Sequence, residues 1–139
     1  MHARIKWVQD VMFVAESGAG HALVLDGPAA GGGRNIGMRP MELMVLSVGS
    51  CSSYDVLTIL KKARQEITSC EAEVTAERVD ATPAIFESIH LHFKLAGHNL
   101  SEKQVARAIE LSAGKYCSAS IMMKNAGVKV THDFEIIET

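Results

Sequence analysis

Two cysteines of this chain stand 66 residues apart, each among small neighbours. Cys51 lies between Gly-Ser and Ser-Ser, and Cys117 is followed by Ser-Ala-Ser. Small neighbours leave room for a substrate or a second sulfur, whereas a cysteine that only fills a core is usually surrounded by larger apolar side chains. The pair indicates thiol redox chemistry; the alternative is that each cysteine is a small core residue.

The two thiols differ in what could activate them. Gly114 predicts a break that would place Cys117 in the first turn of a new helix, where free N–H groups and the positive end of the helix dipole stabilise a thiolate. Lys115 adds a positive charge nearby. Cys51 lies inside a helical pattern with Asp55 four residues on, and this carboxylate would raise the thiol pKa unless a cation offsets it.

The cations that could assist Cys51 are Arg34 and Arg39, which lie in and just after a glycine-rich stretch at 27–37. We expect this stretch to form a loop, so both arginines could equally be solvated loop charges. A phosphate-binding loop is disfavoured because the Gly-Lys-Ser/Thr ending of that motif is missing.

The remaining candidate ligands favour structural roles. Cys70 lies at the start of a predicted strand without small residues on both sides, and buried free cysteines are commonly inert. His90 and His92 share the polar face of a predicted strand and are expected to face solvent. There is no Cys-x-x-Cys pair, and no histidine lies close in sequence to Cys51 or Cys117, so we expect no metal site.

Composition predicts one globular domain over residues 1–139. The net charge of −2 lacks the basic excess that nucleic-acid binding needs. The first residues show no secretory pattern and no uninterrupted apolar run is long enough to span a membrane, so we expect a soluble, cytoplasmic protein. In that reducing compartment a disulfide is expected to be transient and catalytic.

The elements that must position the cysteines follow from the residue patterns, and together they predict an α+β fold. Short strands at 4–8, 11–16 and 21–26 favour an antiparallel meander. Longer strands are predicted at 67–79 and 85–95, the second with alternating apolar and polar residues, and a last strand at 128–137. Ser101 is the predicted cap of a second helix, with Gln104 completing a capping box, and a further helix is predicted at about 117–125.

A long helix predicted at 40–64 carries Cys51. Its first half is so densely apolar that no solvent-facing stripe remains before the lysines at its end. A helix that is apolar on every side must be buried on every side. We therefore expect a partner subunit to cover it, most simply in a symmetric homodimer.

This order of elements resembles the OsmC/Ohr family, and most closely its YhfA-like branch. The resemblance covers almost the whole chain and is carried by the loop ending in Arg-Pro-Met-Glu-Leu at 39–43, by Gly-Ser-Cys-Ser at 49–52, and by Tyr-Cys-Ser-Ala at 116–119. It implies an intertwined homodimer in which two central helices pack against sheets built from both chains.

The resemblance also implies thiol-dependent reduction of organic hydroperoxides. The first cysteine, matched by Cys51, would become a sulfenic acid, and the second, matched by Cys117, would form a disulfide with it. It implies no bound cofactor; an external dithiol, such as a lipoyl group, would restore both thiols. Apolar walls would favour alkyl or fatty-acid hydroperoxides over hydrogen peroxide.

Two positions depart from the peroxidase pattern. The family glutamate falls where this chain has Met41, and the nearest carboxylate is Glu42, about 100° further round the helix. The family arginine is missing from the strand end at 24–27. Glu42, Arg34 and Arg39 are therefore the supporting candidates, and without one of the two arginines Cys51 would keep an ordinary thiol pKa.

Two other functions remain open. The protein could bind an apolar small molecule at the dimer interface, with the cysteines merely lining the pocket. A cysteine hydrolase is the weaker alternative, because no histidine is placed by the sequence to act as the base.

Overall fold

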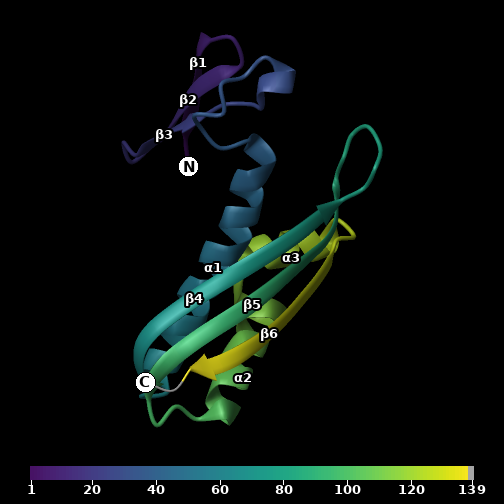
Figure 1. The fold of residues 1–139 in the computed structure, drawn as a ribbon. Coiled ribbons are helices and arrows are strands. Elements are labelled where there is room, and N and C mark those ends of the chain that lie inside the picture. Colours follow the sequence, from purple (N-terminus) through teal and green to yellow (C-terminus); the bar gives the residue numbers. More distant parts are fainter. Residues whose placement is uncertain (138–139) are drawn as a thin grey trace. The chain divides into compact units, whose positions relative to one another are not determined.

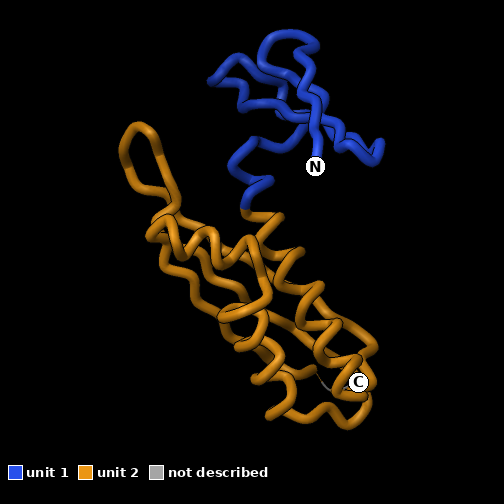
Figure 2. The backbone as a smooth tube through the Cα atoms, turned by 180° about the vertical axis from the view of Figure 1, so that it is seen from behind, with its two compact units in different colours: residues 1–44 blue, residues 45–139 orange. Residues whose placement is uncertain are grey.

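A computed structural model describes residues 1–137 of the chain. It divides the chain into an N-terminal unit, residues 1–44, and a second unit that begins at Val45 (Figure 2). Each unit is compact in itself. The expectation of one domain over residues 1–139 stays a prediction.

The N-terminal unit contains a three-stranded antiparallel sheet, which confirms the predicted meander (Figure 1). Its strands, in the order β1-β2-β3, are Ala3–Gln9, Met12–Ser17 and Ala22–Leu25. After β3 the chain forms the expected loop, interrupted only by a short 3-10 turn at Ala29–Gly31. The loop is held by the buried Asp26, whose carboxylate accepts hydrogen bonds from the backbone N–H groups of Gly27, Arg34 and Ile36.

The helix that carries Cys51 is α1, Pro40–Lys62. Its buried positions in the second unit include Val48, Val56 and Leu60, which are fully enclosed. Leu46 and Tyr54 remain exposed, at 49% and 73%. By length and composition α1 could also cross a membrane, although core helices of soluble proteins pass the same test. Burial of the helix against a second subunit stays a prediction.

The second unit is built on a three-stranded sheet in the order β4-β5-β6, formed by Glu66–Arg78, Phe86–His98 and Lys129–Ile137. The strands β4 and β5 are antiparallel, while β6 pairs parallel to β5. Helices lie on one face of this sheet (Figure 1). The apolar residues of β5 point to that face, with Ile89, Leu91, Phe93 and Leu95 at most 2% exposed.

The predicted alternation of β5 is wrong at its first residues. Ile85 was expected on the apolar face, yet it lies outside the strand and is exposed, while Phe86 is buried. The cause is an irregularity in pairing: Ser88 lies opposite Glu77 and Phe86 opposite Arg78, which leaves Glu87 as an extra residue. Such a bulge moves the residues beyond it to the other face of the sheet.

Two helices connect β5 to β6. Helix α2, Glu102–Leu111, begins at the predicted cap, where Ser101 Oγ accepts the Gln104 N–H at 3.3 Å. The reciprocal half of the capping box comes from elsewhere, because the Ser101 N–H donates to Gln65 Oε1. The chain then continues through a π-helical turn, Ser112–Tyr116, to α3, Ser118–Asn125. The expected break at Gly114 therefore occurs three residues later, at Cys117.

Candidate functional site

Cys117 is the N-terminal cap of α3. Its backbone is extended, and its Sγ accepts the Ser120 N–H at 3.4 Å, the position that a serine or aspartate oxygen usually occupies at a helix start. A second donor comes from α1, where the Ser52 hydroxyl lies 3.1 Å from the same sulfur. Cys117 is fully buried, so these donors replace the water that would otherwise solvate a thiolate.

Helix α1 brings Cys51 to the same place. The Cys51 and Cys117 sulfurs and a carboxylate oxygen of Asp55 all lie within 4.8 Å of one another. The Cys51 sulfur also accepts a hydrogen bond from the Ala119 N–H, in the first turn of α3. Cys51 is half-buried, whereas Cys117 is enclosed. Both thiols therefore share one helix start, and Cys51 is the one that solvent can reach.

The pKa values of the two thiols move in opposite directions. Burial raises the pKa of Cys117, but hydrogen bonds from Ser120, Ser52 and the Cys51 thiol outweigh burial, and the pKa falls below its ordinary value. Burial also raises the pKa of Cys51; the Ala119 N–H opposes this, while the Cys117 thiol and the Asp55 carboxylate add to it. The first proton is therefore lost more readily from Cys117.

Asp55 is the third member of this group. It lies one helical turn after Cys51, as the sequence predicted, and burial raises the pKa of its carboxyl while a hydrogen bond from Ser112 opposes that rise. Its Oδ2 atom is buried without a hydrogen-bond partner among the residues that the structure describes. A buried polar atom without a partner costs free energy, so this oxygen requires an explanation.

The supporting candidates lie in the N-terminal unit. Arg34 is 3.5 Å from the Asp10 carboxylate, and Arg39 donates to the Asn35 side chain at 2.6 Å. Glu42 accepts the Arg39 N–H at 3.0 Å and so caps the start of α1. These contacts fix the loop and the helix start; a role in the chemistry of Cys51 stays a prediction.

The strand end at 24–27, where the sequence lacks the arginine of the peroxidase pattern, contains Asp26. The three backbone N–H groups it accepts hold its pKa below the ordinary value, the Gly27 N–H most strongly. This residue therefore organises the loop and supplies no positive charge.

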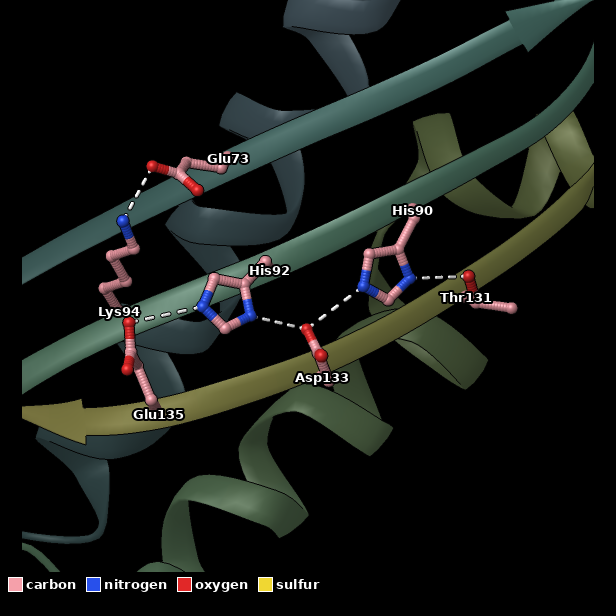
Figure 3. Close-up of polar contacts among 7 residues, drawn as sticks. All are labelled: Glu73, His90, His92, Lys94, Thr131, Asp133 and Glu135. Atoms are coloured by element: carbon pink, nitrogen blue, oxygen red, sulfur yellow. Dashed lines mark hydrogen bonds and ion pairs between the residues drawn. The ribbon is translucent and has the colours of Figure 1, made fainter.

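The other predicted ligands lie elsewhere on the second sheet. Cys70 is half-buried, and burial raises its pKa. His90 and His92 lie on the face of the sheet away from the helices, as predicted, and share Asp133 Oδ1 at 3.1 and 2.6 Å (Figure 3). The His92 ring donates hydrogen bonds to the carboxylates of Asp133 and Glu135, and these bonds raise the pKa of His92. The sequence did not predict this network, because it joins strands whose parallel pairing depends on the tertiary fold.

The serines around Cys117 were also missed. Ser52, Ser112 and Ser120 are buried polar residues, and the hydroxyls of Ser52 and Ser120 lie 3.2 Å apart. The only signal in the sequence was the small size of the residues beside each cysteine. Two of those small residues, Ser52 and Ser120, supply hydrogen-bond donors to the Cys117 sulfur.

Comparisons with known proteins agree with this architecture. The model of the family described as OsmC-like protein matches residues 31–133. Protein YhfA of Escherichia coli is 41% identical over 137 residues, which cover 99% of this chain and 98% of that protein.

Solved structures share the fold. A hypothetical protein from Aquifex aeolicus matches with a TM-score of 0.86 at 29% identity, over 99% of this chain and 96% of that one. The organic hydroperoxide resistance protein OhrB of Bacillus subtilis matches with a TM-score of 0.63 at 16% identity, over 97% and 98%. The family match, the identity to YhfA and the shared fold agree: this chain belongs to the OsmC-like protein family.

Proposed function

We propose that the protein reduces organic hydroperoxides, with Cys51 as the attacking thiol and Cys117 as the resolving thiol. The observation that carries this proposal is the meeting of the two sulfurs, within 4.8 Å of one another, at the start of α3. A disulfide bond is about 2.05 Å long, so side-chain rotation has to close only a short gap. The fold alone would not support this activity, because proteins of one fold can have many different functions.

The hydrogen bonds favour different roles for the two thiols. Cys117 holds the thiolate, and Cys51, which solvent reaches, meets the peroxide. As the Cys51 sulfur attacks the outer oxygen, its proton passes to the Cys117 sulfur, and the O–O bond breaks. The leaving alkoxide takes that proton and departs as an alcohol. Cys51 is then a sulfenic acid, and Cys117 is again a thiolate.

The second step forms the disulfide. The Cys117 thiolate attacks the Cys51 sulfur, the S–O bond breaks, and the hydroxide that leaves is protonated by solvent to water. An external dithiol of the lipoyl type then exchanges with the disulfide, becomes oxidised itself and returns both cysteines to thiols. The scheme uses no bound cofactor.

We propose the same function for a cytoplasmic, dimeric form of the protein. The protein acts in the cytoplasm as a homodimer, in which a second subunit covers the apolar positions of α1 that are exposed here, such as Leu46. In that assembly Cys51 is assisted by a residue of the N-terminal unit. Arg34 or Arg39 would offset the Asp55 charge, and Glu42 would orient the peroxide.

The test is turnover with dihydrolipoamide as the reductant. We expect reduction of cumene hydroperoxide to exceed that of hydrogen peroxide. Cys51→Ser and Cys117→Ser should both fall to the uncatalysed rate, while Cys70→Ser, which removes a thiol outside the pair, should match the unaltered protein. Retention of full activity by Cys51→Ser would refute the proposed role of this residue.

A second candidate function is binding of an apolar small molecule. It is favoured by a cleft of about 510 Å³ in the N-terminal unit, lined mostly by apolar side chains that include Ile5, Phe13 and Leu25. Native mass spectrometry that finds a ligand retained through purification, together with slow alkylation of both cysteines, would favour this function.

A further inference from the structure

We infer that the reduced protein binds a divalent zinc-type metal ion through Cys51, Asp55 and Cys117. Among residues 1–137 these side chains form the one group of three potential ligands whose donor atoms lie mutually within 4.8 Å. This inference goes beyond the proposed function, because it requires only the reduced thiols and not their reaction with peroxide.

The geometry is close to that of a zinc site. Zinc binds thiolate sulfur at about 2.3 Å and carboxylate oxygen at about 2.1 Å, so tetrahedral coordination separates the donor atoms by roughly 3.6 to 3.8 Å. The observed limit of 4.8 Å leaves only a small closing movement. Cys51 and Asp55 stand four residues apart on α1, which places both on one side of the helix, and Cys117 approaches from the start of α3.

The unpartnered oxygen of Asp55 points independently to a cation. Oδ2 is buried and accepts no hydrogen bond within the described part of the chain. A metal ion would satisfy that oxygen and neutralise charge that burial otherwise disfavours.

The surroundings suit thiolate ligands as well. The Ala119 N–H donates to the Cys51 sulfur, and the Ser120 N–H and Ser52 hydroxyl donate to the Cys117 sulfur. Hydrogen bonds of this kind orient ligands and tune a metal site. Two sulfurs favour zinc over magnesium or calcium, which prefer oxygen donors. Three protein ligands leave a fourth position open, and the half-buried Cys51 provides an entry path.

The experiment is titration of the reduced, metal-free protein with Co²⁺, a coloured substitute for Zn²⁺, followed by competition with Zn²⁺. We expect one ion per chain and a thiolate-to-cobalt charge-transfer band. Cys51→Ser and Cys117→Ser should lose that band. Asp55→Asn should keep it but weaken the affinity by more than about 100-fold, a larger loss than removal of an outer-shell partner causes.

Matched controls separate the site from unspecific binding. Cys70→Ser removes a thiol outside the group, and Asp133→Asn removes an exposed carboxylate on β6, so both should bind as the unaltered protein does. Circular dichroism verifies that each variant is folded. Absence of the band in the reduced protein, or unchanged affinity in folded Asp55→Asn, would overturn the inference.

The outcome is distinguishable from failure of the proposed function. Disulfide formation is measured separately, in metal-free protein with a chelator present. A protein that forms the disulfide but binds no Co²⁺ refutes the metal site alone, and one that binds Co²⁺ but is not oxidised by peroxide refutes the peroxidase proposal alone.

Discussion

The middle of α1 and the start of α3 each contribute one cysteine to the same site, yet they treat their thiols differently. At the start of α3, Cys117 receives hydrogen bonds from a backbone N–H and from a serine of the neighbouring helix. In the middle of α1, Cys51 has no free N–H groups of its own helix and has the Asp55 carboxylate one turn away. Burial raises the pKa of both thiols, and only at Cys117 do the hydrogen bonds outweigh it.

The thiol with the lower pKa is therefore not the thiol that solvent can reach. Cys117 has the lowered pKa but is enclosed, and Cys51 has the raised pKa but is half-exposed. Neither thiol alone combines the two properties that a reactive cysteine needs. The hydrogen bond between the thiols joins them, because the buried thiolate can accept the proton of the accessible thiol.

Removal of either cysteine should produce the largest effect and should distinguish their roles. Cys117→Ser lacks the thiolate that accepts the Cys51 proton, so we expect no disulfide and a Cys51 sulfenic acid that forms more slowly and that dimedone traps after hydroperoxide treatment. In Cys51→Ser we expect no trapped product, because Cys117 is enclosed. Mass spectrometry of the peptides checks both, and a sulfenic acid on Cys117 in Cys51→Ser would reverse the assignment.

Loss of a donor to Cys117 should weaken the contrast between the thiols. The Ser52 hydroxyl donates to the Cys117 sulfur and helps to hold the Cys117 pKa below its ordinary value, so Ser52→Ala should raise that pKa. Thiolate absorbance against pH, in a background without Cys51 and Cys70, measures this. Ser53→Ala is the control, since the Ser53 hydroxyl donates to the Gly49 carbonyl and not to a sulfur. The same Cys117 pKa in both variants would show that Ser52 does not stabilise the thiolate.

How far these features follow from the sequence depends on their range. Period and capping patterns predicted the meander, the long helix and the cap at Ser101, because they are local. The bulge at Glu87 and the parallel pairing of β6 depend on strands distant in sequence, so they were not predicted. At the site, the helical spacing placed Asp55 beside Cys51, but the donors Ser52 and Ser120 become recognisable only once two helices are packed together.

Removing the charge of Asp55 should lower the Cys51 pKa and so reduce the difference between the pKa values of the two thiols. Asp55→Asn removes a charge that raises the Cys51 pKa, so Cys51 should be alkylated faster at neutral pH in metal-free protein. Since burial raises the folded-state pKa of Asp55, ionisation destabilises the fold. The free energy of unfolding of Asp55→Asn, relative to that of the unaltered protein, should therefore increase as pH rises above the ordinary carboxyl pKa of 3.8. Denaturant unfolding at several pH values checks this, and a gain on acidification instead would contradict it.

The smallest effect should come from the outer face of the sheet. Asp133 and Glu135 raise the pKa of His92, so its contribution to stability is full below the ordinary value of 6.5 and is lost as pH rises through the raised pKa. His92→Gln should therefore be less stable than the unaltered protein only at the acidic end of that range, and its thiol titrations should not change. A shift of either thiol pKa in this variant would show that the two faces are coupled.

Whether Cys51 and Cys117 form one redox pair can be measured by intact mass and peptide mapping after oxidation. The reduced, metal-free protein is treated with one equivalent of cumene hydroperoxide. We expect the loss of two hydrogen atoms and a cross-linked peptide that joins Cys51 to Cys117, with Cys70 still free. An unchanged mass, or a disulfide that includes Cys70, would contradict it.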